Sequence, residues 1–105
     1  MSPTLFDDFN DRRSIAQRFA EFDAAHPEVY AAFAMFAAQM RGRGYTHYSA
    51  DGIMHIVRYH AAVNAERDGG GFKINNNFVA LYARKLVAAD PSFAGFFAFR
   101  VRRTA

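Results

Sequence analysis

The chain has 105 residues, with 13 Lys and Arg residues against 10 Asp and Glu residues, 12 Phe and no Cys or Trp. This length predicts one domain, residues 1–105, that buries about two-thirds of its surface on folding. The absence of Cys excludes disulfides, thiolate metal sites and a cysteine nucleophile. No apolar run approaches the ~20 residues of a membrane span, and the acidic start at Asp7 and Asp8 argues against a signal peptide. We therefore expect a soluble, cytoplasmic domain with an irregular lead-in over residues 1–11.

Charge is divided unevenly along the chain. Three basic and six acidic residues give residues 1–40 a net charge of −3, whereas ten basic and four acidic residues give residues 41–105 a net charge of +6. Basic segments attract polyanions, and nucleic acid is the usual polyanion for a domain of this kind. The alternative is that the arginines only solvate a surface rich in Ala and Phe.

The predicted elements begin with two amphipathic helices. In the first, apolar residues recur at the i, i+4 and i+7 positions of one helix face: Ile15, Phe19 and Phe22. Asp11 or Asn10 could cap its start. The second helix begins at Pro27, which suits a first helical turn, and ends at Gly42. Its apolar stripe comprises Val29, Phe33, Phe36, Ala37 and Met40.

A short strand and a third helix are expected next. Residues 45–48 are aromatic and long enough for one small strand. Ser49 is a suitable N-cap for a helix that reaches about Ala65. The buried face of this helix comprises Ile53, Ile56, Val57 and Ala61. Three consecutive glycines at 69–71 then predict a loop.

The final third of the chain predicts a helix followed by a strand. The asparagines at 75–77 are poor helix formers but good caps, so a fourth helix begins among them and ends at Asp90. Its apolar face comprises Phe78, Leu81, Tyr82 and Leu86. Apolar and other residues then alternate from Phe97 to Arg102, which is the two-residue period of a half-buried strand.

This order of elements predicts a mainly α fold with a small β element, like a winged helix-turn-helix. The helix pair would be formed by residues 49–65 and 76–89. Their connector is longer than the usual turn of about 3–4 residues. A four-helix domain with a short hairpin is therefore the alternative.

The start of the fourth helix has the residue types of a DNA recognition helix. Asn77, Ala80 and Arg84 lie at i, i+3 and i+7, on a face turned away from most of the apolar stripe. In the major groove Asn can bond adenine and Arg can bond guanine, while flanking lysines can meet phosphates. The alternative is that the asparagines only cap the helix. The residues expected to bind nucleic acid here are Lys73, Asn75, Asn76, Asn77, Arg84 and Lys85.

The densest positive cluster lies in the predicted C-terminal strand. Arg100 and Arg102 would project from one strand face beside Arg103, as a wing that touches the DNA backbone or minor groove requires. The alternative is a solvated edge strand whose charge prevents edge-to-edge association. The residues that could extend this patch are Arg41, Arg43 and Arg58. Most Phe rings are expected in the core, which argues against stacking on single strands.

Signals of catalysis and of cofactor binding are weak. None of the four His residues has the H-x-x-x-H or H-E-x-x-H spacing of a metal site. His55 follows Asp51 by four residues on one helix face, which an ordinary ion pair explains. The glycines at 69–71 lack the Lys-Ser/Thr ending of a P-loop. We expect no enzymatic activity, no metal and no cofactor.

Several short motifs occur together between His47 and Arg100. They are His47-Tyr48-Ser49, Phe72-Lys73-Ile74-Asn75-Asn76-Asn77, Tyr82-Ala83-Arg84 and Gly95-Phe96-Phe97. Over about half of the chain this set resembles a group of small phage and prophage proteins that generally carry no assigned function. The resemblance implies a phage origin and hence a bacterial host cell, and it implies no catalytic residues.

Two functions follow as alternatives. The first is a phage-type protein that binds nucleic acid, with duplex DNA favoured. The second is a small phage inhibitor that binds a host defence protein or a nucleic-acid-processing protein, since a charged surface steers either encounter. A membrane partner is not expected. A homodimer is left open, and its contact could come from Leu5, Phe6 and Phe9.

Overall fold

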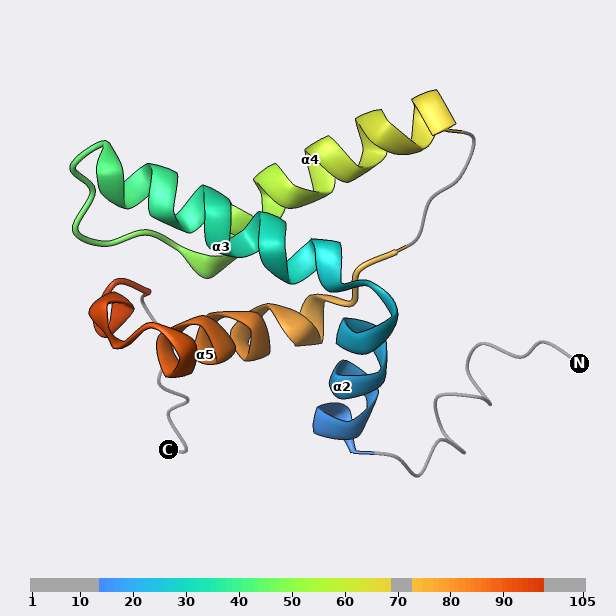
Figure 1. Ribbon diagram of the computed structural model, residues 1–105, viewed down its shortest axis with the longest axis horizontal. Coiled ribbons are helices and arrows are strands. Elements are labelled where there is room, and N and C mark those ends of the chain that lie inside the picture. Colours follow the sequence, from blue (N-terminus) through green and yellow to red (C-terminus); the bar gives the residue numbers. More distant parts are fainter. Residues whose placement is uncertain (1–13, 69–72, 98–105) are drawn as a thin grey trace, which may run out of the picture.

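The computed structural model describes residues 14–68 and 73–97, and these residues are mainly helical (Figure 1). The α-helices are α2 (Ile15–Ala25), α3 (Pro27–Gly42), α4 (Ala50–Asp68) and α5 (Val79–Ala89). Two short 3₁₀ turns, η1 (Asn76–Phe78) and η2 (Pro91–Phe93), flank α5. The mainly α class is thereby confirmed.

The described residues contain no strand. The expected strand at 45–48 is wrong, because only Tyr48 pairs, in an isolated parallel bridge to Phe97. The backbone before Tyr48 is instead drawn toward α3, where the Tyr45 N–H donates to the Met40 carbonyl over 3.3 Å. The strand expected from Phe97 onward lies, after Phe97 itself, outside the described residues.

Local capping explains where the helices begin and end. Ser14 and Gln17 form a reciprocal capping box at the start of α2, so its N-cap is Ser14 and not the expected Asp11 or Asn10, which lie outside the described residues. Helix α3 has the predicted bounds, with Pro27 in its first turn and Gly42 as its last residue. Ser49 caps α4 as predicted, because its hydroxyl accepts from the Gly52 N–H over 3.2 Å.

The core lies where α3, α4 and α5 meet, and the turn after α5 closes it. Phe33 and Tyr82 are fully buried and their rings lie 6.0 Å apart. Helix α2 contributes no fully buried residue. It nevertheless covers the start of α5, because the Phe19 ring meets Tyr82 edge-on at 4.7 Å. The Phe residues assigned to the core from the sequence are buried: Phe33, Phe36, Phe78 and Phe97.

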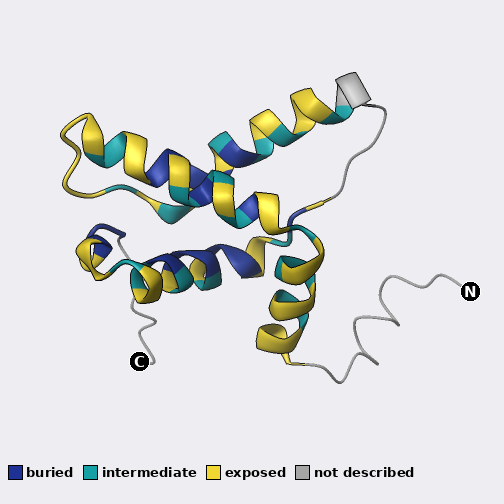
Figure 2. Ribbon diagram, in the orientation of Figure 1, coloured by how far each residue is buried: buried dark blue, intermediate teal, exposed yellow. Residues whose placement is uncertain are grey.

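Helix α4 is longer than the sequence predicted, and its second half projects from the body of the protein. It ends at Asp68 rather than near Ala65. Ile53, Met54 and Val57 are buried, whereas no residue from 58 to 65 is. Figure 2 shows the part of α4 that leads up to its grey end in the colours of exposed and intermediate residues. The buried residues of α4 thus lie in its first two turns, and the third turn touches the body through Arg58 and through the His60 ring, which stacks on Phe36 at 5.0 Å.

Candidate functional site

The outward face of α5 is the first candidate surface. Ala80 and Arg84 of α5 are exposed, as is Asn77 of the η1 turn that precedes this helix. The exposure agrees with the i, i+3 and i+7 spacing, although α5 itself begins at Val79 rather than among the asparagines. The opposite face of the helix comprises the buried residues Val79, Tyr82, Ala83 and Leu86. The core therefore holds α5 by one side, while Ala80 and Arg84 are exposed on the other. Figure 2 shows both buried and exposed residues along α5.

The asparagine run before α5 acts in part as a cap. The Asn75 side chain accepts from the Asn77 N–H over 2.9 Å, as an N-cap does. The Asn76 side-chain oxygen accepts from Arg58 of α4 over 2.6 Å. Arg58 also donates to the Ile74 carbonyl over 3.2 Å. Two asparagines and Arg58 thus fix the segment that leads into α5, and Asn77 keeps an exposed side chain.

The two lysines predicted to flank the α5 face are placed differently. Lys73 is exposed just before the asparagine run. Lys85 turns toward α2, where its ammonium pairs with Asp23 and lies 4.1 Å from the centre of the Tyr30 ring. Lys85 therefore joins α5 to α2 and does not share the outward face with its neighbour Arg84.

The remaining predicted residues, Arg100, Arg102 and Arg103, lie outside the described residues. The described chain ends at Phe97, whose backbone bridges Tyr48. Arg103 is the sixth residue after Phe97.

A second candidate surface is an open groove of about 500 Å³ between the loop that follows α3 and the turn that follows α5. We call it the loop groove. Its polar and aromatic lining includes Arg41, Tyr45, His47, Ser92, Gly95 and Phe96. No residue of α5 lines it. Sequence reasoning named Arg41 as an extension of a basic patch but did not find the groove.

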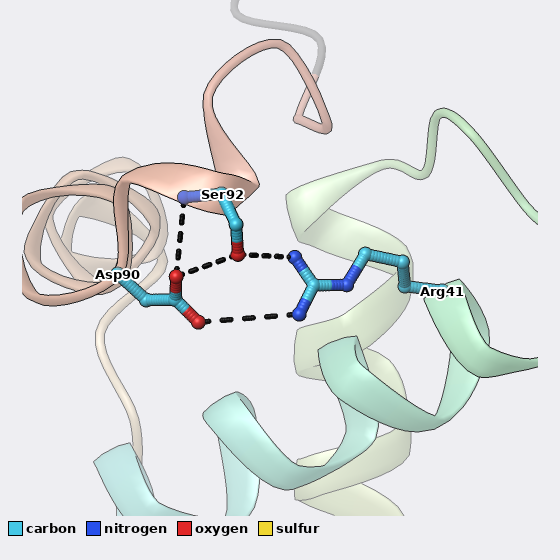
Figure 3. Close-up of polar contacts among 3 residues, drawn as sticks. All are labelled: Arg41, Asp90 and Ser92. Atoms are coloured by element: carbon cyan, nitrogen blue, oxygen red, sulfur yellow. Dashed lines mark hydrogen bonds and ion pairs between the residues drawn. The ribbon is translucent and has the colours of Figure 1, made fainter.

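Arg41 is held at the edge of the loop groove by Asp90, Ser92 and Phe93, and Figure 3 shows its contacts with Asp90 and Ser92. Its guanidinium donates to the Ser92 hydroxyl over 2.7 Å, lies 3.9 Å from an Asp90 oxygen and stacks 3.7 Å above the Phe93 ring centre. Asp90 also accepts from the Ser92 hydroxyl and N–H. These Ser92 hydrogen bonds, followed by the charge of Arg41, hold the pKa of Asp90 below its usual value.

The two walls of the loop groove are joined by direct hydrogen bonds. The Tyr48 N–H donates to the Phe96 carbonyl over 2.9 Å, and His47 Nδ1 lies 3.0 Å from the Gly95 carbonyl oxygen. A carbonyl can only accept, so Nδ1 carries the proton and Nε2 is the remaining polar atom of the ring. Gly44 and Gly95 have φ values of 101° and 82°, which glycine adopts without strain. The groove is therefore built on a constrained backbone.

A separate polar group is buried beneath α2. The Tyr82 side chain is fully buried, and its hydroxyl and the Asp23 Oδ1 atom have no hydrogen-bond partner among the described residues. Burial raises the pKa of Tyr82, and the negative charges of Asp23 and Glu28 raise it further. Tyr82 lies in the core, whereas Asp23 belongs to α2 and is partly buried. Their unpaired atoms bear on the stability of the fold rather than on ligand binding.

Within the described ranges, no three His, Asp or Glu side chains are grouped so that they could hold a metal ion. None of the helices in those ranges is both long and apolar enough to cross a membrane. Comparisons with protein-family models, with curated proteins and with solved structures found no match. The functional argument therefore rests on the side chains of this chain alone.

Proposed function

We propose that the protein is a phage-type nucleic-acid-binding protein that favours duplex DNA and presents the outward face of α5 to it. The observation that carries this proposal is the exposure of Asn77 in the η1 turn and of Ala80 and Arg84 on α5, a helix whose other side is anchored in the core. An Asn amide and an Arg guanidinium are the side chains that bond adenine and guanine in the major groove. The small Ala80 between them allows a close approach.

The charge of the second part of the chain supports the same partner. Beyond residue 40 it carries ten basic and four acidic residues. Lys73 and Arg43 are exposed, and Arg84 adds a guanidinium to the face of α5. Cations at such positions contact phosphates and release counterions when nucleic acid binds.

In its finer form the proposal is a winged helix, with α4 and α5 as the helix pair and the C-terminal arginines as the wing. Support for the wing comes from the sequence, in which Arg100, Arg102 and Arg103 follow Phe97 within six residues. The connector between α4 and α5 is longer than the turn of about 3–4 residues in a usual helix-turn-helix, because seven residues and the η1 turn lie between the two helices. A wing that contacts phosphates predicts that Arg102 and Arg103 add affinity evenly across sequences.

Titration by fluorescence anisotropy tests the proposal with a random duplex, a single strand and an RNA, each at two salt concentrations. We expect duplex affinity that falls steeply with salt. Arg84→Ala should weaken the preference for particular DNA sequences. Arg84→Lys should retain the charge but lose the bidentate hydrogen bond to guanine. Lys85→Met is the matched control because it removes the same charge one position away, on the side that faces α2. No duplex binding at low salt would refute the proposal.

The second candidate function is inhibition of a host defence or nucleic-acid-processing protein. The observation that favours it is on the projecting half of α4, where Tyr59 and Val63 lie one turn apart and are 67% and 36% exposed. Exposed aromatic side chains are common anchors of protein interfaces. Recovery of a host protein by the wild-type chain but not by Tyr59→Ala, together with no duplex binding, would favour this function over the first.

A further inference from the structure

We propose that the loop groove binds a nucleotide, with the base against the Tyr45 ring and the phosphate near Arg41 and His47. The proposal concerns a different surface from the α5 face and does not depend on duplex binding, since no α5 residue lines the groove. A nucleotide combines a flat ring with an anion, and the groove offers a partner for each. The nucleotide could be free or could be one residue of a single strand.

The aromatic partner is Tyr45. Its side chain is 51% exposed although it is a large ring, and it lines the groove. The Tyr48 ring meets Tyr45 edge-on, with centroids 5.3 Å apart and planes 89° apart, and so fixes its orientation. A ring that is held in place and still half exposed is a platform on which a base can stack.

The cationic partner is Arg41. The hydrogen bond to Ser92 and the distant contact with Asp90 engage only part of a guanidinium that carries five N–H donors. The side chain is 38% exposed and lines the groove. The Phe93 ring beneath it and the Ser92 hydroxyl beside it hold the guanidinium in one position. A phosphate would therefore meet a donor that is already oriented.

The groove needs little reorganisation to accept a ligand. His47 and Tyr48 are hydrogen-bonded to residues 95 and 96, which joins its two walls. Its volume of about 500 Å³ is within the range of small-molecule sites, roughly 300–1,000 Å³. A preformed site loses less entropy on binding than one that must order a loop. The amides of residues 44–47 and 94–96 should therefore report binding with small, local shifts.

The test is an NMR titration of the full chain with adenosine monophosphate, adenosine, inorganic phosphate and an oligoadenylate of about eight nucleotides. We expect adenosine monophosphate to shift the groove amides saturably, with an affinity in the range of about 1 mM. Adenosine and phosphate should each bind more weakly, because each meets only one of the two partners. Shifts confined to other surfaces, or none at about 10 mM, would overturn the proposal.

Tyr45→Ala should lower the affinity for the nucleotide about fivefold or more, because base stacking on an aromatic ring contributes at least this factor. Tyr59→Ala is the matched control, since it removes an exposed tyrosine from α4 outside the groove. Equal affinities for the Tyr45→Ala variant and the wild type, with unchanged melting, would contradict the stacking role.

Tighter binding of the oligoadenylate than of adenosine monophosphate, with shifts of the same amides, would identify a single strand as the source of the nucleotide. Equal binding of the two would identify the free nucleotide. Duplex titration of Arg84→Ala remains a separate measurement, so failure here leaves the α5 proposal standing.

Discussion

Replacement of Tyr82 by Phe should stabilise the protein, although it removes a polar group from the fully buried core. The Tyr82 hydroxyl has no hydrogen-bond partner among the described residues and has a pKa raised by burial. An unpaired buried polar group costs about 1–3 kcal/mol. Removal of a single oxygen leaves a space too small to offset this, so we expect Tyr82→Phe to raise the free energy of unfolding by about 1 kcal/mol.

Urea and thermal unfolding at neutral pH measure this change. A gain of about 1 kcal/mol corresponds to a rise in Tm of roughly 4–8 °C for a domain of this size. Tyr59→Phe is the matched control, because that hydroxyl belongs to a side chain that is 67% exposed and should change stability by less than about 0.5 kcal/mol.

The Tyr82→Phe variant should also differ from the wild type in how its stability changes at alkaline pH. Because the pKa of Tyr82 is raised above its usual 10.0 in the folded state, the unfolded chain loses this proton first as the pH rises. The wild type should therefore lose stability above about pH 10, by up to about 1.4 kcal/mol per pH unit from this group, and Tyr82→Phe should lose less. A Phe variant that is less stable by about 1 kcal/mol or more would refute the reasoning, since the hydroxyl would then have a partner. Strong coupling with Asp23→Asn in a double-mutant cycle would identify that partner.

Two further changes test other parts of the structure. Phe33→Ala removes a fully buried ring that stacks on Phe97 at 5.6 Å, and should lower stability by about 3–5 kcal/mol in urea unfolding. A loss below about 1 kcal/mol would contradict the central position of this ring. In a plot of Tm against pH, Asp90→Asn should make the fall of Tm at acid pH less steep. The lowered pKa of Asp90 adds stability above its usual 3.8, and that stability is lost as the pH falls through the folded-state value. An unchanged fall of Tm at acid pH would argue against the Ser92 and Arg41 contacts.

The helices were the most predictable part of the fold, because their signals act over a few residues. Pro27 and Gly42 bound α3, and Ser49 caps α4, as expected. The cap of α2 was missed although its signal was present, since Ser14 and Gln17 have the spacing of a capping box. The strand expected at 45–48 failed for a different reason. A strand forms only where another segment pairs with it, and aromatic composition does not supply that segment.

The candidate sites were predictable only in part. The exposed row on α5 follows from helical spacing, so Asn77 and Arg84 could be placed on one face in advance. The loop groove could not be placed, because Arg41 and Ser92 are 51 residues apart in the chain. Its one local sign was the glycine at position 44, which permits the turn after α3. A glycine of this kind indicates a turn but not what the turn will face.

Arg84 and Lys85 show the division between what the sequence determined and what the tertiary structure decided. Hydrophobic period and capping residues determined that both belong to one amphipathic helix, because those effects act within a few residues. Only the fold decided that Lys85 meets Asp23, which is 62 residues earlier, while Arg84 remains on the exposed side. The path of the chain brings α2 across the start of α5 through packed aromatic rings. Charge counted along the sequence therefore overstated the cations available to a partner, since packing directs Lys85 to a carboxylate of α2.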